Sequence, residues 1–173
     1  MSSNAGLLPR ALEVAPHRWL RWLWLPVAFA LVAIGLWWLG HPQALATPDR
    51  TESATTKAGR SVYLGVTNGS QAGRELTVKD VEIPKASAPG VTAKAWICKG
   101  GSIAETTDPT RFCTDVVEAE GNDLRLGTDQ LMLSVESSSA AKVEIGRVTV
   151  NYREGLQRAE QPVGPTYAVE FIG

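Results

Sequence analysis

The clearest strand pattern in this chain is LMLSVESSSAAKVEIGRVTVNY, residues 131–152. Apolar and polar positions alternate over 131–136, and this period of two is typical of a half-buried strand. The polar run 137–139 predicts a turn, and renewed alternation over 143–152 predicts a second long strand with a bulge at Gly146. Together the two segments predict a β-sheet with one face on a hydrophobic core.

Shorter stretches of the same kind fill the chain from Ser61 to the C-terminus, separated by Gly, Pro, Asn and Asp. Seven or eight strands at roughly ten-residue spacing, with no convincing helix, predict an all-β fold, an antiparallel β-sandwich that resembles immunoglobulin or fibronectin modules in architecture. The resemblance is one of class only, because Trp96 precedes Cys98 instead of lying between the two cysteines. The expected strand residues outside 131–152 are Val62, Leu64 and Val66; Leu76 and Val78, then, after a bulge, Val81 and Ile83; Val91, Ala93, Ala95 and Ile97; Val116 and Val117; Leu124 and Leu126; Tyr167, Val169 and Phe171.

A run of nineteen residues without Asp, Glu, Lys or Arg extends from Trp22 to Gly40. At about 1.5 Å of rise per residue, a helix of this length covers the roughly 30 Å hydrocarbon core of a bilayer. Indole rings settle at the headgroup level, and arginines near a spanning segment stay on the cytoplasmic side. The run therefore predicts a single-pass transmembrane helix with its N-terminus in the cytoplasm, and the expected interface anchors are Arg18, Trp19, Arg21, Trp22, Trp24, Trp37 and Trp38.

These features divide the chain into a cytoplasmic tail (1–21), a transmembrane helix (22–40), a flexible stalk (41–60) and an extracytoplasmic β-sandwich domain (61–173). The stalk is expected because its residues include few large apolar side chains to offset the entropy of ordering. An alternative is a cleaved secretory signal, since Ala44-Leu45-Ala46 fits the small-x-small pattern that signal peptidase recognises. The length of the apolar run and its tryptophans favour an uncleaved signal anchor.

The balance of charges excludes several classes of function. The formal net charge is −1, and residues 49–173 contain 14 basic and 17 acidic side chains. A mildly acidic domain without a basic cluster lacks the electrostatic footprint of nucleic-acid binding. His17 and His41 are the only histidines, so a Ser-His-Asp or Cys-His arrangement cannot be built in the outer domain. We expect no catalytic residues, no cofactor and no enzyme activity.

Metal binding has equally little support in the sequence. The outer domain offers two cysteines and no histidine, whereas a structural zinc site needs four ligands. Four aspartates lie in or beside predicted turns, but their spacing matches no calcium-binding loop, and turns are rich in aspartate regardless. We expect no metal site at these positions, which are Asp108, Asp115, Asp123 and Asp129.

Cys98 and Cys113 are the only cysteines, and both follow the apolar run. Oxidising conditions beyond the membrane predict a disulfide between them, closing a loop of about 15 residues. A stapled polar loop on a rigid sandwich is a plausible recognition site, because binding residues concentrate on such loops. The candidate contact surface consists of Trp96, Lys99, Thr107, Asp108 and Arg111, with core packing the alternative role for Trp96.

The stretch VTVNYREGLQ, residues 148–157, is followed by Gln161 and Gly164. It resembles the ending of small single-pass membrane proteins of unknown function from actinobacteria. The resemblance covers about 25 residues and implies no activity. It implies that Tyr152, Arg153 and Gly155 shape the hairpin that leads into the closing strand.

From these observations we expect a non-catalytic binding or assembly module of the cell envelope, anchored in the cell membrane. Its expected partners are the lipid bilayer and another envelope protein or polymer. Two alternatives remain open at this stage. The chain could be an accessory single-pass subunit of a membrane protein complex, or a secreted structural protein released by signal cleavage after Ala46.

Overall fold

The computed structural model describes residues 20–67 and 69–173, without the side chains of residues 20–23 and 70. Within these ranges the chain forms one α-helix and twelve strands, which confirms a mostly β fold. The helix is α1 (Leu20–Gly40). The strands are β1 (Thr51–Lys57), β2 (Val62–Gly65), β3 (Glu75–Glu82), β4 (Val91–Lys99), β5 (Glu105–Thr106), β6 (Asp115–Glu118), β7 (Asp123–Arg125), β8 (Gln130–Ser137), β9 (Ala141–Ile145), β10 (Val148–Glu154), β11 (Gln157–Val163) and β12 (Thr166–Ile172), with short 3₁₀ turns η1 (Gly69–Gln71) and η2 (Pro109–Arg111).

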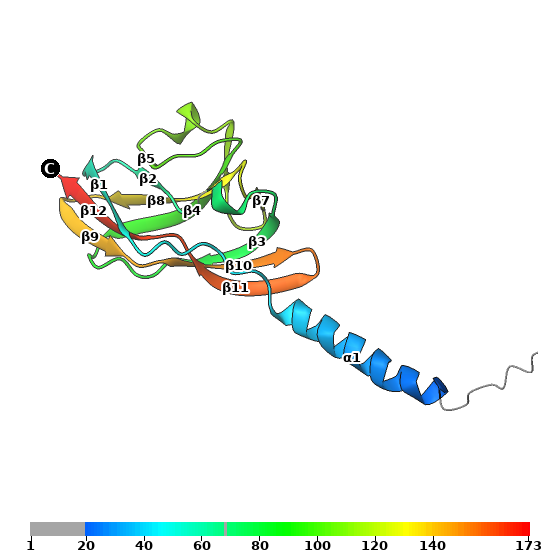
Figure 1. The fold of residues 1–173 in the computed structure, drawn as a ribbon. Coiled ribbons are helices and arrows are strands. Elements are labelled where there is room, and N and C mark those ends of the chain that lie inside the picture. The colour runs from blue at the N-terminus through cyan, green and yellow to red at the C-terminus, as the bar shows by residue number, and fades with distance from the viewer. Residues whose placement is uncertain (1–19, 68) are drawn as a thin grey trace, which may run out of the picture. The chain divides into compact units, whose positions relative to one another are not determined.

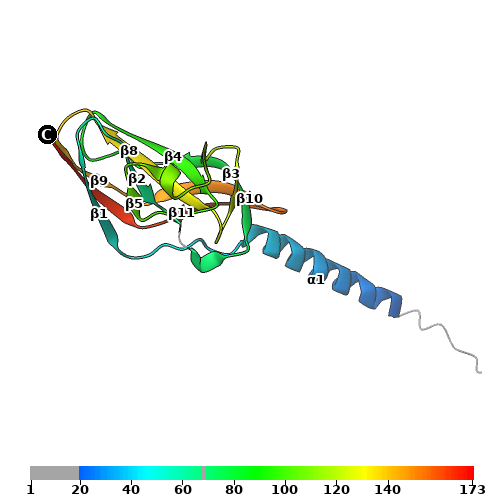
Figure 2. The ribbon, with the colours of Figure 1, turned by 90° about the horizontal axis from the view of Figure 1, so that it is seen from above.

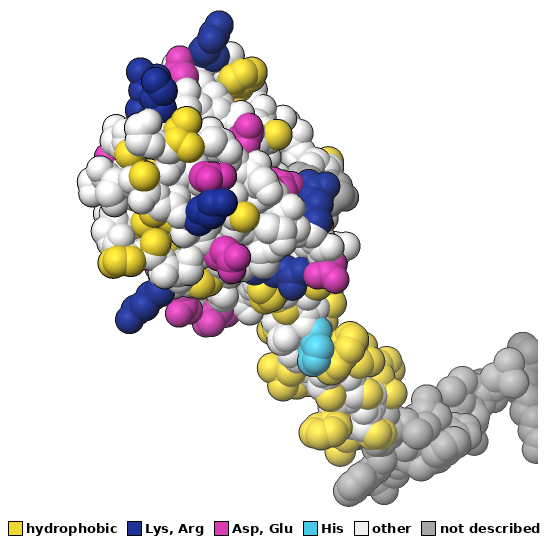
Figure 3. Space-filling model, turned by 90° about the vertical axis from the view of Figure 1, so that its left-hand side faces the viewer, with side chains coloured by type: hydrophobic (Ala, Val, Ile, Leu, Met, Phe, Trp, Pro, Cys, Tyr) yellow, Lys and Arg dark blue, Asp and Glu magenta, His cyan; other side chains and the backbone are white. Residues whose placement is uncertain are grey.

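Two compact units make up the chain, residues 1–37 and residues 38–173. The second unit, here called the β-domain, contains all twelve strands. Helix α1, most of which belongs to the first unit, occupies the predicted apolar run. Its described apolar side chains are exposed apart from the half-buried Leu39, as Figure 3 shows for the face in view. Within the residues that the structure describes, no helix has the length and apolar character needed to cross a membrane.

The strands of the β-domain form three sheets, with strand orders β1-β12-β9, β11-β10-β3-β7 and β5-β2-β8-β4-β6. Strands β9 and β10 form one arm of a long hairpin, and β11 and β12 form the other, as Figures 1 and 2 show. The arms are interrupted between Ile145 and Val148 and between Val163 and Thr166. The irregularity is at the predicted position of Gly146, but the extra residue is in the other arm, because residues 146–147 lie opposite residues 164–166. Because β9 and β12 belong to the first sheet and β10 and β11 to the second, this hairpin links the two sheets.

A second predicted irregularity is also present. The register between β3 and β10 shifts between Asn151 and Tyr152, so that Lys79 is an extra residue in β3. This shift is the bulge that the change of phase between Val78 and Val81 predicts. It lets Val81 and Ile83, as well as Leu76 and Val78, pack on the core.

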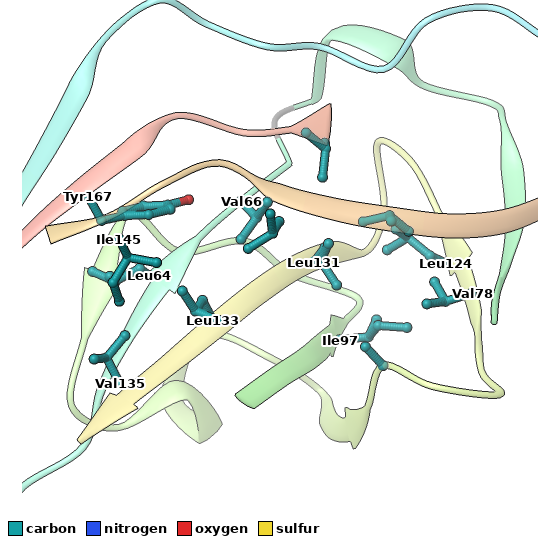
Figure 4. Packing of buried hydrophobic residues seen from close by; sticks show 14 of the residues in the cluster. Leu64, Val66, Val78, Ile97, Leu124, Leu131, Leu133, Val135, Ile145 and Tyr167 are labelled. Carbon is teal, nitrogen blue, oxygen red and sulfur yellow. The ribbon is translucent and has the colours of Figure 1, made fainter. Parts of the chain in front are cut away.

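The main core lies between the five-stranded sheet and the other two sheets, and Figure 4 shows part of it. From β8, Leu131, Leu133 and Val135 point into it, as their alternation predicts, and none is more than 1% exposed. Residues from the facing sheets include Ile145 and Tyr167. The Tyr167 hydroxyl donates a hydrogen bond to the Gly65 carbonyl at 2.8 Å, which satisfies a polar group that burial would otherwise penalise.

The prediction of an unpacked stalk over 41–60 is wrong. Strand β1 lies within it and pairs in parallel with β12, from Thr51 opposite Thr166 to Lys57 opposite Ile172. Ala54 and Thr56 are buried. The backbone supplies the stabilisation here through ladder hydrogen bonds with β12, so a segment with few large apolar side chains can still be ordered.

Residues 38–46, here called the linker segment, are packed on the rest of the β-domain. Leu45 is 6% exposed and joins the main core. Backbone groups along the segment form five hydrogen bonds with the rest of the domain. Three side chains donate to its carbonyls: the Gln157 Nε2 to Trp38 at 2.7 Å, an Arg74 guanidinium nitrogen to Gln43 at 3.1 Å and the Gln71 Nε2 to Ala44 at 2.7 Å. The Gly164 amide donates to the Ala46 carbonyl at 3.1 Å. The Leu45 amide in turn donates to the Gln161 Oε1 at 2.9 Å.

The segment 157–163, which is not among the strands that apolar alternation predicts, is strand β11. It is the outer strand of its sheet and pairs with β10 alone. An outer strand can accept a proline, because one edge of its backbone has no partner strand. Apolar alternation reveals neither β1 nor β11. Strand β1 is ordered by its parallel pairing with β12, and β11 can contain a proline because it is the outer strand of its sheet.

Candidate functional site

The disulfide between Cys98 and Cys113 is present, which confirms the prediction. It joins the end of β4 to the residues just before β6, and the two Cα atoms lie 5.1 Å apart. Cys98 is fully buried and Cys113 nearly so. The loop between them, residues 99–112, contains β5 and η2 and is here called the stapled loop.

Local sequence explains how the stapled loop turns back on itself. Asp108 is the N-cap of η2, and its Oδ1 accepts hydrogen bonds from the Thr110 amide at 3.2 Å and the Thr110 hydroxyl at 2.6 Å. Pro109 follows, in the first turn where a missing amide hydrogen costs nothing. A Cβ at Gly101 would lie 2.0 Å from the Phe112 carbonyl oxygen, so this close approach requires glycine.

Gln130 fixes the stapled loop on the sheet beneath it. Its Oε1 accepts from the Ile103 amide at 2.6 Å, and its Nε2 donates to the Thr67 carbonyl at 2.7 Å. Both bonds are buried, and the Gly65 amide adds a third contact by donating to the Ala104 carbonyl at 3.0 Å. The loop is therefore positioned by the rigid strands β2 and β8.

The stapled loop also creates a second, smaller hydrophobic cluster on the outer face of the five-stranded sheet. The cluster consists of Cys98, Ile103, Cys113 and Met132, with Trp96 among the half-buried residues around it. Met132 is fully buried, although its alternation with Leu131 and Leu133 predicts that it faces away from the core. It does face away from the main core, but the loop covers it.

Asp129 joins the base of the stapled loop to the turn before β8. Its side chain is 8% exposed and accepts hydrogen bonds from the Gly100 amide at 3.0 Å, the Arg125 amide at 3.2 Å and the Lys99 Nζ at 3.2 Å. Burial acts to raise the pKa of Asp129, but the two amides and the Lys99 ammonium outweigh it and lower the pKa below its ordinary value. Asp129 is thus a structural anion, and no sequence motif distinguishes it from the other turn aspartates.

A groove of about 640 Å³ lies alongside the stapled loop. A second hollow, of about 440 Å³, lies on the other side of Thr128 and Asp129 and is lined by charged side chains including Glu75, Lys99 and Arg125. The first groove is lined mainly by glycine, small polar residues and exposed backbone, an arrangement that can hydrogen-bond an extended polar partner. Its lining residues are Thr67, Gly69, Gly100, Gly101, Ser102, Ile103, Ala104, Gly127, Thr128, Asp129 and Gln130.

The structure separates the five residues of the predicted contact surface. Thr107, Asp108 and Arg111 are exposed on the stapled loop. Trp96 is half-buried against the smaller cluster, and its Nε1 donates to the Ser134 hydroxyl at 2.9 Å. Lys99 turns toward Asp129 and also donates to the Asp123 carbonyl. Packing and ion pairing therefore engage Trp96 and Lys99 within the domain.

Phe112 is a surface residue of the stapled loop that the sequence pattern does not single out. It caps the C-terminal end of η2 and is 55% exposed. Its position next to Cys113 is the signal that could have identified it, because a disulfide fixes the backbone on which it stands. An exposed aromatic ring on a fixed backbone is a typical anchor for a partner.

Asp129→Asn should destabilise the protein by about 2 kcal/mol at pH 7, because the substitution removes charge-assisted hydrogen bonds. The lowered pKa means that the stabilisation is complete above the unfolded pKa of about 3.9 and is lost as the pH falls through the lower folded pKa. Urea unfolding at pH 7 and at about pH 3 measures this. A difference between the two proteins that stays constant down to pH 2 would contradict the assignment.

The chain matches no protein-family model, and no curated protein matches it in sequence. Among solved structures it is similar to a family 123 glycoside hydrolase from Clostridium perfringens, with a TM-score of 0.35 and 7% sequence identity. The similarity covers 71% of this chain and 23% of that protein, so the chain spans about a quarter of its length. A similarity of this size carries no conclusion about the activity of the chain.

Proposed function

We propose that this chain is a single-pass membrane protein whose extracytoplasmic β-domain acts as a non-catalytic binding or assembly module of the cell envelope. In this proposal residues 22–40 span the cell membrane, the N-terminus is cytoplasmic, and the partners are the bilayer and another envelope protein or polymer. In this proposal the β-domain is a sandwich that resembles immunoglobulin and fibronectin modules in architecture. The face that meets the partner is the stapled loop with its adjoining groove.

The exposed apolar surface of α1 is the observation that carries the proposal. Trp24 is 70% exposed, Phe29 76%, Leu36 65% and Trp37 63%. The other described apolar residues of the helix are also exposed, except Leu39, which is half-buried. A helix that is apolar all round gains free energy only by burial in a protein core or in lipid, because each Å² of apolar surface left in water costs about 25 cal/mol.

The expected anchor residues are only partly within the described structure. Trp24, Trp37 and Trp38 are all more than half exposed. Arg18, Trp19, Arg21 and Trp22 lie outside the residues whose side chains are described. The three described tryptophans are in the outer turns of the apolar run, where indole rings suit the bilayer interface.

The disulfide supports the extracytoplasmic side of the proposal. Both cysteines are buried in the smaller cluster under the stapled loop, and no cysteine in the described residues is free. Disulfides of this kind form and persist in oxidising compartments and are rare in the cytoplasm. A cytoplasmic location would leave the stapled loop without its cross-link.

The packing of the linker segment favours an uncleaved anchor over a secreted protein. Cleavage after Ala46 would remove Leu45 from the main core. It would also remove the partners of Gln157, Arg74, Gln71 and Gln161. A domain that evolved to be released after Ala46 would not be expected to depend on residues that the cleavage discards.

Three of the groups with shifted pKa values, Arg74, Tyr152 and Tyr167, are engaged in holding the fold, which favours a non-catalytic role. The hydrogen bond to Glu154 raises the pKa of Arg74, and burial raises the pKa of Tyr152 and Tyr167. The Tyr152 hydroxyl donates to the Gln161 Oε1 at 3.1 Å. Active-site groups are usually shifted in a cleft where they face substrate, and these groups face the linker segment and the core.

The location is tested by protease treatment of spheroplasts that carry the chain with an epitope tag at each end. We expect the C-terminal tag to be digested and the N-terminal tag to be protected, with the full chain resistant to carbonate extraction. Mass spectrometry of the purified chain should show no fragment beginning at Thr47. Such a fragment would establish the secreted alternative, and a protected C-terminal tag would overturn the proposed orientation.

The binding face is tested by a photo-crosslinking amino acid placed at one of two phenylalanines in native membranes. At Phe112 on the stapled loop we expect capture of an envelope protein or polymer. At Phe29 on α1 we expect lipid only. These two positions give chemically matched substitutions, and both side chains are more than half exposed. Capture of a membrane protein from position 29 alone would instead establish the accessory-subunit alternative.

A further inference from the structure

The β10–β11 hairpin ends in a two-residue turn with an exposed apolar side chain. Glu154 pairs with Gln157, so Gly155 and Leu156 form the whole connection. Gly155 has a φ of 57°, as the first position of a tight type II′ turn requires. Leu156 is 81% exposed, the most exposed large apolar side chain of the described residues. Turn chemistry favours small polar residues at this position. A side chain this exposed has little packing, so packing does not explain the leucine either.

Two arginines flank this turn. Arg153 and Arg158 lie directly opposite each other on β10 and β11, and both are exposed. Among the described residues neither forms a salt bridge. Like charges at directly opposite positions destabilise a strand pair. An anion bound between them would remove this repulsion.

The nearest carboxylate in the sequence does not neutralise the pair. Glu154 is taken by Arg74, whose guanidinium donates to both of its carboxylate oxygens, at 3.0 and 2.6 Å. The Arg153 Nε donates to the Gly155 carbonyl at 2.8 Å, which holds its guanidinium at the turn. The end of the hairpin therefore presents a net positive charge around an apolar side chain.

Contacts within the β-domain place this end of the hairpin at the start of the domain. Gln157, which follows Leu156, is 8% exposed, and its Nε2 donates to the carbonyl of Trp38, the first residue of the β-domain. If residues 22–40 span the bilayer, Trp38 lies at the headgroup level. The turn then lies at the same level, within reach of lipid headgroups.

We propose that Arg153, Gly155, Leu156 and Arg158, here called the hairpin tip, form a second membrane contact that binds the phosphates of anionic lipids. This inference rests on the proposed membrane anchor. The arginines pair with lipid phosphate oxygens, and Leu156 enters the apolar edge of the interface. One leucine and two arginines would bind a membrane only weakly by themselves. The anchor keeps them at a high effective concentration beside the bilayer.

The test uses the full chain reconstituted in vesicles, with a spin label on a cysteine introduced by Leu156→Cys. Because both native cysteines are in the disulfide, the introduced thiol is the only one that reacts. The control is Ser138→Cys, in the exposed turn between β8 and β9 at the opposite end of the long hairpin. In vesicles containing phosphatidylglycerol we expect the label at 156 to be accessible to oxygen and protected from an aqueous nickel reagent, and the label at 138 to be fully accessible to nickel.

The lipid chemistry is tested by combining Leu156→Cys with Arg153→Gln and Arg158→Gln. Loss of two arginines should reduce the ratio of immersed to water-exposed label by roughly 30-fold, and replacing phosphatidylglycerol with phosphatidylcholine should have a similar effect. A label at 156 as accessible to nickel as the control, in a chain that still resists carbonate extraction, would overturn the hairpin tip alone. Equal immersion in both lipids would overturn the role of anionic headgroups. Protection seen only in native membranes would assign the tip to a protein partner instead, and a chain extracted by carbonate would overturn the anchor itself.

Discussion

Replacing both Cys98 and Cys113 with alanine should lower the free energy of unfolding by about 3 kcal/mol. The two residues are 15 positions apart, and closing a loop of this length removes about that much chain entropy from the unfolded state. For a domain of this size the loss corresponds to a fall of roughly 10 °C in Tm. Calorimetry or thermal unfolding followed by circular dichroism measures it.

Reduction provides the control for this prediction. A reductant should destabilise the native chain by a similar amount and leave the double alanine variant unchanged. The effect should be concentrated in the stapled loop, where the Ile103 and Gly100 amides should exchange faster with solvent. A double variant within 0.5 kcal/mol of the native chain would show that the hydrogen bonds of Gln130 and Asp129 hold the loop without the disulfide.

Leu45→Ala should destabilise the β-domain by about 2–4 kcal/mol, although Leu45 lies outside every helix and strand. Leu45 is 6% exposed in the main core, and large-to-small changes at such positions lose both burial and packing. Its amide bond to Gln161 does not depend on the side chain and should persist. Chemical unfolding of the full chain in detergent, followed by tryptophan fluorescence, measures the change.

Leu156→Ala is the matched control, since it makes the same chemical change at a leucine that is 81% exposed. It should change the free energy of unfolding by no more than about 0.5 kcal/mol. If the two variants behave alike, the linker segment does not pack on the β-domain in solution. The argument against cleavage after Ala46 would then lose its basis.

The linker segment also bears on how a membrane anchor could serve a binding module. Five backbone groups of residues 38–46 are hydrogen-bonded to the β-domain, and Arg74 connects the Gln43 carbonyl to Glu154 on β10. A flexible stalk would let the domain sample many orientations. Residues 38–46 pack on the rest of the β-domain and therefore do not form such a stalk.

Apolar alternation was sufficient to locate the central strands. Leu131, Leu133 and Val135 on β8 are buried as expected, and the change of phase in β3 corresponds to a real bulge. The disulfide could be expected from the cysteine count and from the apolar run. These predictions succeed because each depends on the properties of neighbouring residues, which the sequence contains directly.

The strands that the sequence did not predict are ordered by pairing with other strands. Strand β1, TESATTK, is ordered by pairing with β12 more than a hundred residues later, and β11 is ordered by β10 despite Pro162. Asp129 resembles any turn aspartate until the fold places the Gly100 amide and the Lys99 ammonium around it. Met132 is buried only because the stapled loop covers it.

The sequence by itself determined the β class of the domain, the apolar helix and the disulfide, because periodicity, hydrophobicity and cysteine number are local or compositional properties. Only the tertiary structure decided that residues 38–57 belong to the folded domain, that Trp96 and Lys99 are held within it and that Arg153 faces Arg158 across the hairpin. Those outcomes depend on backbone hydrogen bonds and side-chain contacts between segments far apart in the chain. Such contacts do not require a particular local sequence pattern, so a single sequence contains no signal for them.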